Sequence, residues 1–114
     1  MSTEPSSTIF ARLMRVIEDR KANPPARSYT TSLLEGGVAK IGAKIVEEAG
    51  EVVQAAAEPG DQGRSHLVYE SADLVYHLFV LLAHRDIPLD ELEAELARRF
   101  GISGIDEKES RPAK

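Results

Sequence analysis

Acidic residues gather in two short clusters of this 114-residue chain, and each cluster lies in a segment with helical periodicity. The first cluster holds Glu47, Glu48 and Glu51, and the second holds Glu70 and Asp73. Side chains three positions apart are neighbours on a helix and like charges there repel each other, so each cluster costs stability unless a cation compensates it. Mg²⁺ prefers carboxylate, water and phosphate oxygens as ligands. The two clusters therefore point to a Mg²⁺ site.

The segment between the clusters is suited to bring them together. Residues 58–63 contain a proline and two glycines, and their number fits a turn between two antiparallel helices. In such a hairpin Glu48 lies level with Asp73 and Glu51 lies level with Glu70, about 10 to 15 Å from the turn at a helical rise of about 1.5 Å per residue. The two acidic pairs would then face each other and form a cage of oxygen atoms.

Helical periodicity extends over most of the chain, and no strand pattern or internal repeat is found, so we predict an all-α fold. Thr8 is the expected N-cap of the first helix, and Gly36 with Gly37 is expected to end a short second helix. Gly101 is expected to end the last helix. The predicted helices cover residues 9–22, 28–34, 38–57, 64–84 and 89–100.

The two long central helices, 38–57 and 64–84, carry apolar faces wider than one short chain can cover. We therefore predict a helical bundle whose central antiparallel hairpin is completed by dimerisation. The chain is expected to form a single domain, 1–114, with flexible ends at 1–8 and about 105–114.

Composition excludes several classes of protein. The absence of cysteine excludes disulfides, zinc–thiolate sites and a cysteine nucleophile. The net charge of −5 argues against binding of long nucleic acid, whose phosphates need a basic surface. The first eight residues lack the apolar core of a signal peptide, and no apolar run is long enough to span a membrane. These features predict a soluble, cytoplasmic protein.

Several short motifs together resemble phosphoribosyl-ATP pyrophosphohydrolase of histidine biosynthesis, over about residues 28–111. They are Ser28-Tyr29-Thr30, Lys40-Ile41, Lys44, Glu47-Glu48-x-x-Glu51, Glu70-x-x-Asp73-Leu74, Tyr76-His77 and Arg99-x-Gly101-x-Ser103-Gly104. The acidic part alone is shared with the wider all-α nucleoside triphosphate pyrophosphatase superfamily, which includes MazG-like enzymes. The resemblance implies the all-α fold of that superfamily and Mg²⁺-dependent hydrolysis of phosphoribosyl-ATP to phosphoribosyl-AMP and pyrophosphate.

Each site residue has an expected role. We expect Glu48, Glu51, Glu70 and Asp73 to bind Mg²⁺ directly, and Glu47 to be a further ligand or the group that orients the attacking water. The residues expected to bind substrate are Lys44, Lys40, Tyr29 and Thr30. For Tyr29 and Thr30, only the resemblance implies contact with the substrate. His77, one turn beyond Asp73, is expected to hold that carboxylate in place.

Simpler interpretations stay open beside these. Lys44 fits an ordinary ion pair within its helix equally well, and His77 is somewhat more typical of a satisfied interior histidine. Lys108 and Arg111 fit a disordered tail better than a basic arm over a polyphosphate. For the whole chain the alternatives are a MazG-like (d)NTP pyrophosphatase and a non-catalytic helical dimerisation module.

Overall fold

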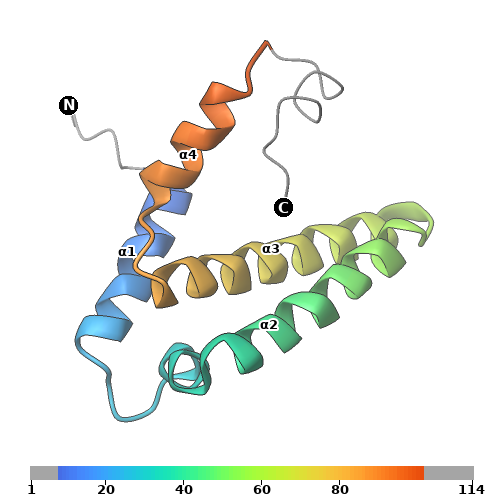
Figure 1. The fold of residues 1–114 in the computed structure, drawn as a ribbon. Helices are drawn as coiled ribbons and strands as arrows, with labels where there is room; N and C mark the ends of the chain where they lie inside the picture. Colours follow the sequence, from blue (N-terminus) through green and yellow to red (C-terminus); the bar gives the residue numbers. More distant parts are fainter. Residues whose placement is uncertain (1–7, 102–114) are drawn as a thin grey trace, which may run out of the picture.

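The computed structural model describes residues 8–101 and places four helices in that range, with no strand (Figure 1). Their bounds are α1 Ile9–Ala22, α2 Tyr29–Ala56, α3 Gly60–His84 and α4 Leu89–Arg98. α2 and α3 form an antiparallel hairpin with the most extensive contact in the molecule, and α1 crosses the end of the hairpin opposite its turn (Figure 1). The predicted all-α class and central hairpin are confirmed. Dimerisation stays a prediction.

α1 has the bounds that the sequence predicted. Thr8 Oγ1 accepts a hydrogen bond of 3.1 Å from the backbone N–H of Ala11, as an N-cap does. Near its other end, Lys21 Nζ donates to the carbonyl oxygens of Ala83 and His84, at 3.0 and 3.1 Å, and pairs with Asp86 Oδ1 at 2.6 Å. The last carbonyls of α3 thereby gain a cationic donor, which fixes α1 at that end of the hairpin.

α2 contains the bend that the glycine pair predicted. Its first turn is capped by Ser28 Oγ, which accepts from the N–H of Thr31 at 3.1 Å. At Gly37 the backbone angles are φ 71° and ψ −161°, which a residue with a side chain rarely adopts. The helical segment before the bend runs past the predicted end at residue 34, and its axis changes direction at Gly37 (Figure 1).

Two further predicted helix ends are wrong. α3 begins at Gly60 instead of residue 64, because Pro59 is compatible with a helix start and Gly63 fits closely against Glu58 in the turn. A Cβ at Gly63 would lie 2.2 Å from the carbonyl oxygen of Glu58, so only glycine allows so tight a turn. α4 ends at Arg98 instead of Phe100, and Gly101 follows in the left-handed region with φ 81°.

The core lies where α1 meets the bend of α2 and the second half of α3. Its buried apolar side chains are Met14, Ile17, Leu33, Ile41, Phe79, Val80 and Ala83. On α3, Leu78 is 37 % exposed, while its neighbours Phe79 and Val80 are buried. Val46 and Val53 on α2 and Val68 on α3 are more than 60 % exposed. The hairpin thus keeps an uncovered apolar surface in the single chain.

Some predictions fall on residues that the structure does not describe. The flexible ends predicted at 1–8 and 105–114 lie outside the described range, except Thr8, which is fixed as the cap of α1. Lys108 and Arg111 also lie outside that range. Among the helices that are described, none is both long enough and apolar enough to traverse a lipid bilayer.

Candidate metal centre

Three carboxylates converge in the α2–α3 hairpin. Glu48 and Glu51 come from α2 and Glu70 comes from α3, and one carboxylate oxygen of each lies within 4.8 Å of the others. Glu48 is 4 % exposed and Glu70 is 7 % exposed. The helix spacing explains the arrangement, since residues three apart on α2 share one face and the antiparallel α3 brings Glu70 level with them. The structure therefore brings together three of the four ligands predicted from the sequence.

Asp73, the fourth predicted ligand, does not belong to this group of three. Its side chain is half-buried on α3, one turn beyond Glu70. Its charge is close enough to contribute to the raised pKa of Glu48, after the stronger effects of burial, Glu70 and Glu51. The carboxylate of Asp73 thus borders the cluster without entering it.

The donor set of the cluster fits a hard cation. Glu48 Oε2 and Glu70 Oε1 are both buried and accept no hydrogen bond. Carboxylate oxygens cannot donate, so such oxygens approach each other only by sharing a proton or a cation. A buried carboxylate oxygen without a partner carries a large desolvation cost, and a divalent cation with oxygen ligands removes it.

The pKa values of the three glutamates reflect their close approach in a buried site. Burial, a proton shared with Glu70 and then the charge of Glu51 raise the pKa of Glu48 to about 7. The pKa of Glu51 is also raised, first by a proton shared with Glu70 and then by burial. Burial works to raise the pKa of Glu70, but the proton shared with Glu51, the hydrogen bond from His66 and the proton shared with Glu48 outweigh burial and lower it. Of these three glutamates, Glu70 is thus the one that ionises most readily without a metal.

Lys44 and Glu47 lie at the border of the cluster. Lys44 Nζ is 2.7 Å from Glu47 Oε1 and 3.8 Å from Glu48 Oε1. The bond with Glu47 raises the pKa of Lys44, so its ammonium group stays charged beside the carboxylates. The side chain of Glu47 is 52 % exposed and lies outside the group of three. The ion pair within the helix is therefore present, and it places a cation next to Glu48.

Lys40 lies away from the cluster. Its Nζ donates to Ser32 Oγ at 3.2 Å, across the bend at Gly37. This contact joins the two straight parts of α2, so the structure gives Lys40 a local role at the bend.

A network of aromatic and polar side chains joins the start of α2 to α3. His77 Nδ1 faces the backbone oxygen of Asp73 at 2.8 Å, and an oxygen of that kind only accepts, so Nδ1 carries a proton. In the neutral ring Nε2 then accepts from the hydroxyl of Tyr29 at 2.9 Å. Thr30 Oγ1 forms a short hydrogen bond with the hydroxyl of Tyr76, whose ring stacks on that of Tyr29.

This network changes the role predicted for His77. The ring holds the backbone of Asp73 instead of its carboxylate, and it is buried with both nitrogens occupied. His77 is therefore the satisfied interior histidine of the simpler interpretation, and it fixes Tyr29 near the cluster. The charges of Lys44, Glu48 and Asp73 are close enough to act on the pKa of Tyr29, which burial chiefly raises.

His66 was missed by the sequence analysis. Its Nε2 lies 3.0 Å from Glu70 Oε2, and its Nδ1 lies 3.0 Å from both carboxylate oxygens of Glu58. Hydrogen bonds with Glu58 and then Glu70 raise the pKa of His66, so the imidazolium is favoured and both nitrogens donate. The spacing of four residues from His66 to Glu70 could have indicated this contact.

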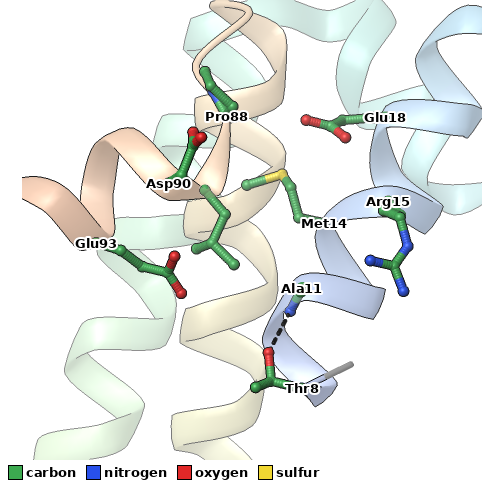
Figure 2. Close-up of a pocket in the computed structure, with 9 residues that line it drawn as sticks. Thr8, Ala11, Met14, Arg15, Glu18, Pro88, Asp90 and Glu93 are labelled. Carbon is green, nitrogen blue, oxygen red and sulfur yellow. Dashed lines mark hydrogen bonds between the residues drawn. The ribbon is translucent and has the colours of Figure 1, made fainter. Parts of the chain in front are cut away.

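A pocket of about 430 Å³ between α1 and the start of α4 offers no competing site for an anionic substrate (Figure 2). Its floor includes Met14 and Leu89, and its rim carries Glu18, Asp90 and Glu93 beside one arginine. None of the predicted site residues lines it. The carboxylates on its rim repel phosphate groups, and they do not converge as the glutamates of the hairpin do.

Comparison with known proteins identifies the family. The family profile described as phosphoribosyl-ATP pyrophosphohydrolase matches residues 10–100. A phosphoribosyl-ATP pyrophosphatase of Rhodopirellula baltica is 56 % identical over 90 % of this chain and 86 % of its own length. Proteins of the same name from Geotalea daltonii and Neisseria meningitidis are 53 % and 43 % identical, over 90 % and 91 % of this chain and 94 % of their own lengths. The chain belongs to the phosphoribosyl-ATP pyrophosphohydrolase family.

Proposed function

We propose that this protein hydrolyses phosphoribosyl-ATP to phosphoribosyl-AMP and pyrophosphate in histidine biosynthesis, with Mg²⁺ held by the carboxylates of the α2–α3 hairpin. The observation that carries the proposal is the convergence of Glu48, Glu51 and Glu70 within 4.8 Å in a chain of this family. Two of these glutamates have a buried oxygen that accepts no hydrogen bond, which suits a cation.

Glu48, Glu51 and Glu70 are the proposed direct ligands of Mg²⁺, and Asp73 borders them as a further candidate. When bound, Mg²⁺ neutralises charge on the phosphate groups, aligns them and lowers the pKa of a coordinated water. The residues of the chain contribute a fixed anionic cage on two packed helices, so little reorganisation is needed when a substrate arrives.

Lys44 and Glu47 are suited to act beside the cage. Lys44 is charged and half-buried, and its Nζ lies close to Glu48, so it can contact a phosphate oxygen without large movement. When Lys44 turns toward a phosphate, Glu47 loses its partner and becomes free to accept a proton from the attacking water. This exchange would give the ion pair a role in the reaction.

Tyr29 is the proposed contact for the nucleoside part of the substrate. One face of its ring stacks on Tyr76, and its hydroxyl is fixed by His77, yet the residue as a whole is 52 % exposed. A rigid, partly exposed aromatic ring can stack on a purine base. Thr30 is buried and bonded to Tyr76, so it supports this ring instead of meeting the substrate.

A homodimer in the cytoplasm is the proposed form of the enzyme. The surface of the hairpin exposes Val46 by 74 %, Val53 by 71 % and Val68 by 66 %. Apolar side chains grouped in this way on long helices favour burial against a second subunit. The net charge of −5 argues against binding of long nucleic acid.

A substrate panel tests the proposal. The purified protein is incubated with phosphoribosyl-ATP, the common NTPs or the dNTPs, each with Mg²⁺, and the release of pyrophosphate is measured. We expect release from phosphoribosyl-ATP, with phosphoribosyl-AMP as the other product, at a kcat/KM well above that for any NTP. Preferential hydrolysis of an NTP or dNTP would contradict the assignment of the substrate, and no hydrolysis of any compound would contradict the assignment of an enzyme.

A further inference from the structure

We infer that His66 is a positioning residue of the metal centre, which turns Glu70 so that a single oxygen, Oε1, faces the cation. The inference deepens the proposed function and rests on its assignment of a metal to the glutamate cluster. It gives a task to a histidine that lies in the first turns of α3, next to the turn of the hairpin.

The two oxygens of Glu70 have different surroundings. Oε2 lies 3.0 Å from His66 Nε2, whereas Oε1 is buried and accepts no hydrogen bond. A carboxylate oxygen only accepts, so the ring nitrogen donates to it. With Oε2 occupied by the histidine, Oε1 is the oxygen left to bind a cation. This geometry orients the ligand in the way that outer hydrogen-bond partners orient metal ligands in general.

The ring of His66 is itself held from the other side. Nδ1 lies 3.0 Å from both oxygens of Glu58, in the turn between α2 and α3. Glu58, His66 and Glu70 therefore form a chain that connects the turn to the metal centre. The ring cannot rotate away from Glu70 without losing its contact with Glu58 as well.

The contacts of His66 with Glu70 and with Glu58 differ in how easily water can replace them. The side chain of Glu70 is 9 % exposed, so water cannot easily replace the hydrogen bond from His66. The side chain of Glu58 is 44 % exposed, and water can take over much of its contact. Loss of His66 should therefore affect the metal centre much more than loss of Glu58.

Titration of the protein with Mn²⁺, followed by electron paramagnetic resonance, tests the inference without an activity measurement. We expect His66→Leu to weaken Mn²⁺ binding by about tenfold or more, the usual effect of removing such a partner. His66→Gln, which keeps a side-chain N–H donor, should bind within about threefold of the wild type. Glu58→Gln should have a small effect in the wild type and none in the His66→Leu background, because it acts through the ring.

His84→Leu is the matched control, because this histidine lies at the far end of the same helix and makes no hydrogen bond with the glutamates of the cluster. It should leave Mn²⁺ binding unchanged. Thermal melts without metal show whether each variant is folded. Excess Mg²⁺ should restore the turnover of His66→Leu once those melts show that the metal-free variant is folded.

Glu51→Gln separates failure of this inference from failure of the metal centre. If Glu51→Gln abolishes Mn²⁺ binding while His66→Leu binds as the wild type does, His66 has no positioning role and the metal centre stands. If neither variant alters Mn²⁺ binding, the metal lies elsewhere, and both the inference and the proposed centre are wrong.

Discussion

Glu48 and Glu70 meet across the α2–α3 hairpin, and each keeps one buried carboxylate oxygen that accepts no hydrogen bond. Two such oxygens from separate helices would repel each other if both groups were ionised without a cation. A stable fold could easily place a lysine or an apolar residue at either position. The pair therefore supports the proposed metal centre, and the predictions below test it.

Glu51→Gln and Glu70→Gln should each abolish turnover and leave the metal-free protein as stable as the wild type or more stable. Each change removes a proposed ligand and also removes repulsion among the carboxylates. Circular dichroism during thermal melting, with and without Mg²⁺, measures stability beside an activity assay. Mg²⁺ should raise the melting temperature of the wild type and leave that of the double variant unchanged. Near-normal activity in either single variant would refute the ligand assignment.

The stability of the metal-free protein should fall as the pH rises from about 4.5 to about 7. Burial and the bond with Glu70 raise the pKa of Glu48 from 4.5 to about 7, so the folded chain keeps a proton that the unfolded chain releases. The raised pKa values of Glu51 and His66 act in the same direction. Urea unfolding at a series of pH values measures the slope of the free energy of unfolding against pH.

Glu48→Gln is the control for this pH dependence and should flatten the slope in that range. Mg²⁺ displaces the proton, so its stabilising effect should be larger at pH 8 than at pH 5.5. A free energy of unfolding that rises between pH 5 and 7 in the wild type would contradict the raised pKa of Glu48.

Tyr29→Phe should lower the free energy of unfolding by about 1 kcal/mol, because buried Nε2 of His77 loses its hydrogen-bond partner. The ring that stacks on Tyr76 is kept, so any loss of activity should be modest and Mn²⁺ binding should be unchanged. Chemical denaturation and Mn²⁺ titration measure the two effects. An altered Mn²⁺ affinity would show that the Tyr29–His77 pair also acts on the metal centre.

Leu78→Asp should prevent assembly of the homodimer. Leu78 is a 37 % exposed apolar residue of α3, and we place it in the hairpin surface that the proposed dimer covers. A carboxylate there would be tolerated in the single chain but buried without a partner in the dimer. Light scattering at low micromolar concentration should show a dimer for the wild type and for Ala94→Asp, an exposed position on α4. A folded and active wild-type monomer would refute the dimer.

The helices with strong local end signals were predictable from the sequence. Thr8 and the prolines after Asn23 define α1, and the glycine pair predicts the bend at Gly37, because both depend on interactions within a few residues of the chain. The start of α3 was not predictable in the same way. The role of Gly63 depends on its contact with Glu58 in the tightly closed hairpin, so composition alone suggested a longer loop.

Part of the candidate site was likewise predictable from the sequence, and part was not. The spacing of Glu48, Glu51 and Glu70 predicted their convergence, because a hairpin of regular helices fixes which faces meet. The partners of His77 and His66 depend on ring orientation and on a residue in the turn, which helical periodicity does not describe. Burial of Phe79 and Val80 instead of Leu78 likewise follows from where α1 packs.

The central claim is that the glutamates of the hairpin bind the metal on which turnover depends. A crystal structure of the active wild-type enzyme soaked with Mn²⁺ tests it most directly, through the anomalous scattering of the metal. We expect an anomalous peak bounded by Glu48, Glu51 and Glu70, with Oε1 of Glu70 as the nearer of its two oxygens. A Mn²⁺ peak bound by other residues, with no metal between these three glutamates, would contradict the account.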